Sequence, residues 1–217
     1  MNVNGMNADG IGRGPTIDLL RHGDTGQRSY RGQLDDALTD DGWAQLRAAV
    51  VGHEWDAIVS SPLQRCAAFA RELAAARGLP LRLDARLAEY HFGDWQGVPI
   101  ERLAERDGDA LGRFWADPVV NPPPGAETFA AFRIRLCAAL DSIAHDRSTH
   151  AAPGPRTLVI THGGAIRLLR CIEAGRGFGD MAGIDVAHAS LHRLSWPRRG
   201  HDETASPVEA VSVQASA

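Results

Sequence analysis

Residues 16–25 read TIDLLRHGDT, and this stretch decides the fold class. The first five residues, 16–20, have the length and the apolar character of a buried strand. They end abruptly in Arg21, His22 and Gly23, a cation, an imidazole and a glycine in direct succession. A turn needs only the glycine, so the two polar side chains require another explanation. We therefore expect a strand whose carboxyl end opens into a functional site.

Working outward, short apolar runs alternate with longer segments of helical spacing. The runs expected as strands are 16–20, 56–60, 80–83, 157–160 and 191–196. The segments expected as helices are 42–51, 62–78, 99–106, 127–145 and 164–174. This alternation is typical of a parallel sheet covered on both faces. The sequence predicts an α/β fold, a three-layer sandwich with a mostly parallel central sheet and helices on both faces.

Local signals mark where two of these helices begin and end. Ser61 and Pro62 read as a capping hydroxyl followed by proline at the first helical position, and Gly78 is well placed to end that helix. Asp40 or Asp41 is expected to cap the helix before it.

The length of 217 residues suits one domain, which we expect over residues 15–196. We expect a flexible N-terminus at residues 1–14 and a loosely ordered tail at residues 197–217. Residues 107–126 include three consecutive prolines and a glycine. This segment is expected to be an excursion over the surface, because a strong helical pattern follows it.

The composition excludes several classes of protein. The net charge is −4, which gives no indication of a nucleic-acid partner. No run approaches the ~20 apolar residues that span a bilayer, and the first residues do not resemble a signal peptide. Three widely spaced cysteines argue against a disulfide framework or a zinc ribbon. We expect a cytoplasmic protein with no nucleic-acid or membrane partner, and a homodimer is left open.

Polar side chains follow three of the expected strands. Arg21 and His22 follow the first, Arg65 lies in the first turn of the helix after the second, and His162 and Gly163 follow the fourth. Ligands of parallel α/β sheets bind at the carboxyl ends of the strands. The two arginines, two histidines and nearby helix N-termini would form an anion site on an acidic protein.

This set of side chains suits a phosphoryl group. Arginine binds two phosphoryl oxygens at once, and two arginines roughly neutralise the dianion. A neutral imidazole can attack phosphorus, and nearby guanidinium groups favour its neutral form. The leaving alkoxide then needs a proton donor. The best candidate is Glu89, which lies among Tyr90, Phe92 and Trp95, because an apolar setting helps a carboxyl hold a proton.

Six motifs resemble the histidine phosphatase superfamily, also called the phosphoglycerate mutase-like family, and they follow its order. They are LLRHGDT (19–25), GQLDDALTDDG (32–42), SSPLQR (60–65), LAEYHFGDWQG (87–97), PPGAETF (123–129) and THGG (161–164). The resemblance implies that His22 is the nucleophile, which becomes phosphohistidine, and that Arg21, Arg65 and His162 hold the phosphoryl group. It implies that Glu89 donates the proton. It also implies a metal-independent, acid-type phosphatase without a cofactor.

Three further residues are candidate substrate contacts, namely Thr25, Arg28 and Gly163. Arg28 stands where members of the family often have Asn, and this departure could alter phosphate contacts or substrate choice. Residues 124–128 read PGAET where many members have PGGES, and we expect this change to affect only a loop.

The interval between Glu89 and His162 lacks the longer insertion of the glycolytic mutases, which favours a phosphatase. The phrases SPLQRCAAFA (61–70) and FWADP (114–118) resemble the α-ribazole phosphatase type of late cobalamin synthesis. This resemblance implies that the substrate is a small phosphate ester, α-ribazole 5′-phosphate or a cobalamin precursor that carries it. A broad-specificity phosphatase, a mutase, a non-catalytic scaffold and a metal-dependent hydrolase using His22, His91 and His162 remain as alternatives.

One geometric consequence follows from the first motif. Adjacent residues on a strand point to opposite faces of a sheet. Arg21 and His22 can therefore reach one phosphoryl group only if the strand ends by Leu20 or Arg21. We expect Gly23 to permit a sharp turn directly afterwards.

Overall fold

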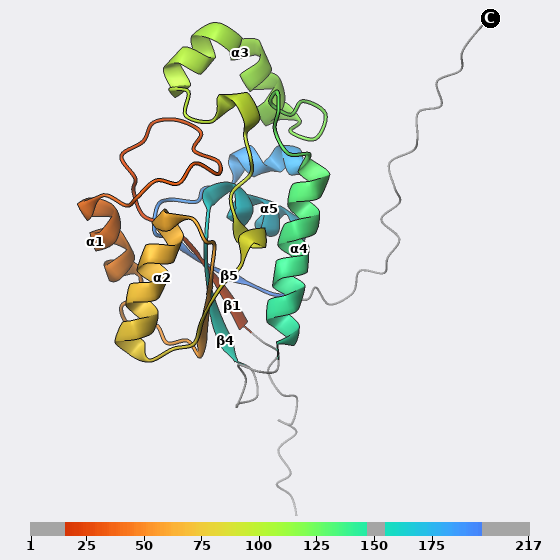
Figure 1. Ribbon diagram of the computed structural model, residues 1–217. Coiled ribbons are helices and arrows are strands. Elements are labelled where there is room, and N and C mark those ends of the chain that lie inside the picture. The colour runs from red at the N-terminus through yellow and green to blue at the C-terminus, as the bar shows by residue number, and fades with distance from the viewer. Residues whose placement is uncertain (1–15, 147–154, 197–217) are drawn as a thin grey trace, which may run out of the picture.

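The computed structural model describes residues 16–146 and 155–196, in which a five-stranded sheet lies between layers of helices (Figure 1). The strand order is β3-β2-β4-β1-β5. The strands are β1 (Thr16–Arg21), β2 (Ala57–Ser60), β3 (Leu81–Leu83), β4 (Arg156–Thr161) and β5 (Leu191–Leu194). The pairs β1–β4, β4–β2 and β2–β3 are parallel, and β5 is antiparallel to β1. The predicted α/β class with a mostly parallel sheet is confirmed.

Helices cover both faces of this sheet. They are α1 (Asp40–Ala49), α2 (Gln64–Arg77), α3 (Ile100–Ala116), α4 (Phe129–His145) and α5 (Gly163–Ala174). Short 3-10 helices lie at η1 (Ala85–Leu87), η2 (Gly93–Trp95) and η3 (Phe178–Gly183). Helices α1 and α2 lie on one side of the sheet and α4 and α5 on the other, whereas α3 lies beyond one end of the strands, at the top of Figure 1. No helix of the described residues is both long and apolar enough to cross a bilayer.

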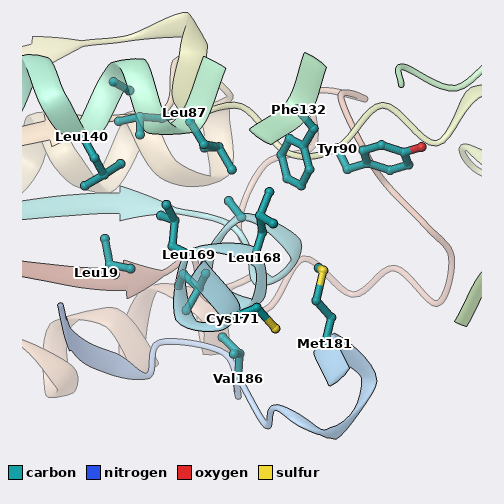
Figure 2. Close-up of a cluster of buried hydrophobic side chains, with 14 of the residues drawn as sticks. Leu19, Leu87, Tyr90, Phe132, Leu140, Leu168, Leu169, Cys171, Met181 and Val186 are labelled. Carbon is teal, nitrogen blue, oxygen red and sulfur yellow. The ribbon is translucent and has the colours of Figure 1, made fainter. Parts of the chain in front are cut away.

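The alternation of side chains along β1 builds two cores. Leu19 belongs to the cluster formed with α4 and α5, and its neighbour Leu20 belongs to the cluster formed with α1 and α2. Figure 2 shows the first of these clusters, with Leu140 from α4 and Leu168 and Leu169 from α5. Since each face of β1 packs its own set of side chains, a slip of one residue would move each set into the other core and disrupt the packing of both.

The strand that carries the first motif ends as its geometry requires. Strand β1 ends at Arg21, so His22 lies beyond the last regular strand residue, and its N–H donates to the carbonyl of Thr161 at 3.0 Å. Gly23 is needed for a different reason from the one expected. Its backbone does not have a positive φ, but a Cβ there would lie 2.2 Å from the carbonyl oxygen of Gly42. The close approach of two backbones, and not a left-handed turn, requires this glycine.

The predicted start of α2 is wrong. The helix begins at Gln64, its N-cap is Leu63, and no side chain caps it. The hydroxyl of Ser61 instead lies 2.8 Å from Nε2 of His162, so a tertiary contact replaces the expected cap. The predicted end is confirmed, because Gly78 adopts the left-handed conformation with φ of 64°.

Two other predicted boundaries need correction. The cap of α1 is Thr39, whose hydroxyl accepts the N–H of Gly42, while Asp40 and Asp41 lie in the first turn. Helix α3 is longer than the predicted 99–106, because it continues to Ala116 through a kink at Asp107. About half of the expected surface excursion is therefore helical. The expectations for residues 1–14 and 197–217 lie outside the described residues.

Candidate active site

A cavity of about 260 Å³ lies at the carboxyl ends of the parallel strands. The residues singled out in the sequence that line it are Arg21, His22, Thr25, Arg65, Glu89 and Gly163. His162 is fully buried beside them, with its ring centroid 5.3 Å from that of His22. Arg28 is exposed and does not line the cavity. The structure thus brings together side chains from distant segments, while the substrate contact of Arg28 stays a prediction.

His22 is held as a neutral imidazole with one nitrogen free. Its Nδ1 lies 2.8 Å from the carbonyl oxygen of Gly23, a geometry in which Nδ1–H donates and Nε2 keeps its lone pair. Burial lowers the pKa of His22 well below 6.5, and the guanidinium groups of Arg65 and Arg21 lower it further. The expected effect of the arginines is present, but burial is the larger cause.

Arg65 is almost completely buried, and most of its guanidinium group is used within the protein. Nη1 donates to the carbonyl of Leu34 and Nη2 to that of Gly32, both at 2.6 Å, and Nε lies 3.2 Å from Nδ1 of His162. Because a guanidinium has five N–H groups, two remain for a ligand. Arg65 therefore supplies charge to the cavity and also fixes the loop that follows Arg31.

His162 lies beneath the cavity and holds a defined tautomer. Its Nδ1 faces Nε of Arg65, which can only donate, so Nδ1 accepts and the ring proton resides on Nε2. That proton is donated to Oγ of Ser61 at 2.8 Å. Burial lowers the pKa of His162 well below 6.5, with further lowering from Arg65 and His22. In this arrangement the ring packs against His22, and a contact with a phosphoryl group stays a prediction.

Arg21 presents an unpaired donor at the cavity. Its Nη1 donates to the carbonyl of Val186 at 2.6 Å, but Nε is buried and has no hydrogen-bond partner among the described residues. A buried N–H without a partner is costly and rare in native proteins. The guanidinium packs over Gly163, where a Cβ would lie 3.3 Å from Nε. The geometry suits an anionic ligand that accepts from Arg21.

Glu89 lies at the N-terminus of α5. Its carboxylate accepts the N–H groups of Gly164 at 2.9 Å and of Ala165 at 3.1 Å. A Cβ on Gly164 would lie 2.5 Å from Oε1, so a glycine is needed for this contact. The flanking aromatic residues Tyr90 and Trp95 are buried in the core. The carboxyl group therefore lines the cavity at a helix N-terminus rather than in a purely apolar pocket.

Two basic residues that line the cavity were missed from the sequence, Arg167 and His188. Arg167 lies on α5, and its Nε donates to the carbonyl of Ile184 at 2.9 Å. His188 precedes β5, which runs antiparallel to β1 and so delivers its preceding loop to the carboxyl edge of the sheet. The helix that begins at Gly163 was a signal for Arg167, since one turn places residue 167 above residue 163. Nothing local indicated His188.

Much of the remaining cavity wall is aromatic and aliphatic, although Gln27, Ser29 and Arg31 also line it. Its members include Tyr30, Phe92, Phe114, Trp115, Phe129 and Met181. The ring of Tyr30 lies 4.7 Å from that of Phe92, and Nε1 of Trp115 donates to the hydroxyl of Tyr30 at 2.8 Å. The cavity thus joins a cationic end to an apolar, aromatic end. Among the described residues, no group of three or more His, Cys, Asp or Glu side chains could hold a metal ion.

Comparison with known proteins agrees with this geometry. The family model of the histidine phosphatase superfamily (branch 1) matches residues 17–205, which is most of the chain. The chain belongs to the histidine phosphatase superfamily. The first motif, the two arginines and the THGG segment all lie within the matched range.

Several relatives in the family have assigned activities. The chain is 36% identical over 200 residues to a glucosyl-3-phosphoglycerate phosphatase of Mycobacterium tuberculosis, covering 87% of this chain and 81% of that protein. It is 35% identical over 185 residues to a bifunctional protein of the same organism, covering 80% of this chain and 48% of that protein. The chain thus spans about half the length of the first curated relatives that it matches.

Solved structures of the family have the same architecture. A mycobacterial glucosyl-3-phosphoglycerate phosphatase aligns with a TM-score of 0.73 and 28% identity, over 83% of this chain and 90% of that one. The α-ribazole phosphatase from Shigella flexneri aligns with a TM-score of 0.68 and 24% identity, over 82% of this chain and 89% of that one. At that identity the second likeness concerns the fold alone.

Proposed function

We propose that the protein is a phosphomonoesterase that acts through a phosphohistidine on His22. The observation that carries this proposal is the state of that imidazole. Its Nδ1 is tied to the Gly23 carbonyl, its neutral form is favoured, and it lines a cavity that also holds the guanidinium groups of Arg21 and Arg65. An imidazole in this state is a nucleophile with one available lone pair.

The reaction follows from these positions. The Nε2 lone pair of His22 attacks phosphorus, and the bond from phosphorus to the ester oxygen breaks. Glu89, in its protonated form, gives a proton to the departing oxygen. Water then attacks the phosphohistidine with Glu89 as the base, the N–P bond breaks, and inorganic phosphate and neutral His22 result. Arg21 and Arg65 stabilise the charge on the outer oxygens.

The aromatic end of the cavity supports an apolar, planar leaving group. A ring entering beside Tyr30 and Trp115 would contact aromatic faces while the phosphoryl group contacts Arg21. Together with the sequence phrases, this supports α-ribazole 5′-phosphate, whose base is aromatic, as the substrate. The reaction would then belong to late cobalamin synthesis.

Two observations favour a second candidate, a glucosyl-3-phosphoglycerate phosphatase. The relative of that name is 36% identical over most of both chains. Arg167 also adds a cation to the cavity, and a carboxylate of such a substrate would pair with it. The two candidates differ in the side chains that each would contact beyond Arg21, namely the aromatic wall for the first and Arg167 for the second.

The chemistry is tested with p-nitrophenyl phosphate in buffer containing EDTA. We expect turnover by the intact chain, a loss of at least ~10³-fold in kcat for His22→Asn, and an acid-labile phosphoryl group trapped on the intact chain alone. His53→Asn is the matched control, because His53 is exposed and does not line the cavity. Full activity in His22→Asn, or activity that requires an added metal, would refute the proposal.

The substrate is tested by comparing kcat/KM for α-ribazole 5′-phosphate and glucosyl-3-phosphoglycerate. Trp115→Ala should lower kcat/KM for the first ester about tenfold and leave the second nearly unchanged, because only the first has an aromatic ring. Arg167→Met should lower kcat/KM for glucosyl-3-phosphoglycerate more than for α-ribazole 5′-phosphate, because only the former carries a carboxylate. A substrate preference for glucosyl-3-phosphoglycerate in the intact chain would select the second candidate.

A further inference from the structure

A third histidine, His188, lies at the phosphoryl end of the cavity. Its ring centroid is 5.6 Å from that of His22, and its side chain is 33% exposed. It comes from the loop between α5 and β5, which shares no motif with the segment that carries His22. The two imidazoles therefore line one cavity although they lie far apart in the sequence.

The backbone beside His188 is held in an unusual conformation. Ala189 has φ of 55°, and it is the one non-glycine residue with positive φ in the described part of the chain. Residues with a Cβ rarely adopt this conformation. The N–H of Ala189 donates to the carbonyl of His22 at 3.2 Å, and the N–H of Arg21 donates to the carbonyl of Ser190 at 3.1 Å. These two bonds fasten the loop to the first motif and fix the place of the imidazole.

A carboxylate lies behind the His188 ring. Nδ1 is 3.8 Å from Oδ1 of Asp24. The other oxygen of Asp24 accepts from the hydroxyl of Thr39 at 3.0 Å and from the N–H of Gly26 at 2.9 Å, so this carboxylate is fixed in place. The arrangement turns Nδ1 toward Asp24 and leaves Nε2 on the opposite side of the ring, where it is available to a ligand.

The charges around His188 set its response to a ligand. Burial lowers the pKa of His188, the nearby Arg21 lowers it further, and Asp24 raises it. The other group that faces it is His22, which is neutral, and the Asp185 carboxylate earlier in its own loop interacts with Arg21. An arriving dianion offsets the repulsion from Arg21, and the protonated ring then has one N–H for Asp24 and one for the anion.

We propose that His188 is a third imidazole of the phosphoryl site, which binds an outer oxygen of the phosphoryl group through Nε2 while Nδ1 faces the Asp24 carboxylate. The proposal rests on the proposed function, because it needs a phosphomonoester in this cavity. It adds a ligand contact that comes from the loop before β5 and not from the six motifs described above. It also makes the binding of phosphate depend on a proton taken up by His188.

The test measures the competitive inhibition constant of inorganic phosphate and KM for p-nitrophenyl phosphate in the intact chain, His188→Ala and His188→Gln. We expect both constants to rise about tenfold in His188→Ala at pH 6 and less at pH 8. Inorganic phosphate itself titrates in this pH range, but equally for every variant. A difference between variants in how the two constants change with pH therefore comes from His188. His192→Asn is the matched control, because His192 is also half-buried and lies in β5 outside the cavity lining.

A second measurement does not require turnover. In the His22→Asn background, phosphate is added to protein with ¹⁵N-labelled histidine, and the ring resonances of His188 are followed. The expected result is a shift of both ring nitrogens toward the protonated form. The proposal would be overturned if the inhibition constant and KM of His188→Ala stayed within twofold of those of the intact chain at every pH. It would equally be overturned if phosphate bound without shifting the ring resonances of His188. If phosphate neither bound nor inhibited any variant, the proposed function itself would fail.

Discussion

Nε of Arg65 lies 3.2 Å from Nδ1 of His162, although 97 positions separate the two residues in the sequence. Since a guanidinium group can only donate, this contact fixes the histidine tautomer and sends its proton toward Ser61. The position and protonation state of one buried imidazole are thus set by a helix residue on one side and a loop hydroxyl on the other.

Ser61→Ala tests this arrangement. The substitution leaves the buried Nε2–H of His162 without its oxygen acceptor, and we expect the free energy of unfolding to fall by ~1–3 kcal/mol. Urea denaturation measures the change. Ser142→Ala is the control, because Ser142 is exposed and should change stability by less than ~0.5 kcal/mol. Equal stability of Ser61→Ala and the intact chain would contradict the assigned tautomer.

Stability should depend on pH through His22 and His162. The pKa of each lies well below 6.5 in the folded chain, so below pH 6.5 the unfolded state binds more protons than the folded state. Stability is therefore fully present above pH 6.5 and is lost as the pH falls from there. The expected slope is ~1.4 kcal/mol per pH unit for each imidazole that titrates only when unfolded.

Urea denaturation of the intact chain and of His22→Asn between pH 7 and about pH 5 measures this slope. Removing one buried imidazole should reduce the slope by roughly 1.4 kcal/mol per pH unit. His53→Asn should leave it unchanged, since that side chain is exposed. The same slope in His22→Asn and the intact chain would show that His22 takes up a proton as readily in the fold as in the unfolded chain.

Glu89→Gln separates proton donation from structure. Glutamine keeps one oxygen that can accept from Gly164, loses the acceptor for Ala165, and cannot donate the proton that an alkoxide needs. We expect kcat for an alkyl phosphate to fall ~10²-fold and kcat for p-nitrophenyl phosphate to fall much less, because nitrophenolate leaves without a proton. The exposed Glu101→Gln serves as the control. Equal losses for the two esters would mean that Glu89 has another role.

Gly23→Ala tests the close approach of two backbones. The added Cβ would lie 2.2 Å from the carbonyl oxygen of Gly42, so one segment must move, at a cost of more than ~1–3 kcal/mol. Gly112→Ala is the matched control in α3, with no atom near its new Cβ, and should raise stability by ~0.5–1 kcal/mol. Thermal and urea unfolding measure both. A stable, active Gly23→Ala would show that the contact is loose.

The sequence predicted the fold class because its signals are local. Runs of apolar residues gave four strands within one residue and β5 within two, and β1 ended at Arg21 as the two-residue period requires. The sequence predicted the start of α2 and the end of α3 less accurately. The hydroxyl of Ser61 binds His162 instead of capping α2. The glycines in α3 argue against a helix, yet burial of Phe114 against the aromatic residues Tyr90 and Trp95 stabilises one.

Some features of the candidate site could likewise be predicted from the sequence, and others depend on tertiary packing. Arg21 and His22 are adjacent in the sequence, and their motif could be read directly, whereas the burial that keeps His22 neutral depends on segments that pack around it. His188 reaches the site because β5 pairs antiparallel with β1, and no residue near it specifies that partner.

The sequence by itself determined the order of strands and helices and the polar residues at the strand ends, because hydrophobic period and residue chemistry act over a few neighbouring positions. Only the tertiary structure decided which side chains share the cavity, which protonation state each imidazole has, and which hydroxyl caps a helix or binds a histidine. Those outcomes depend on distances between groups that are far apart along the chain and on the removal of water from around them.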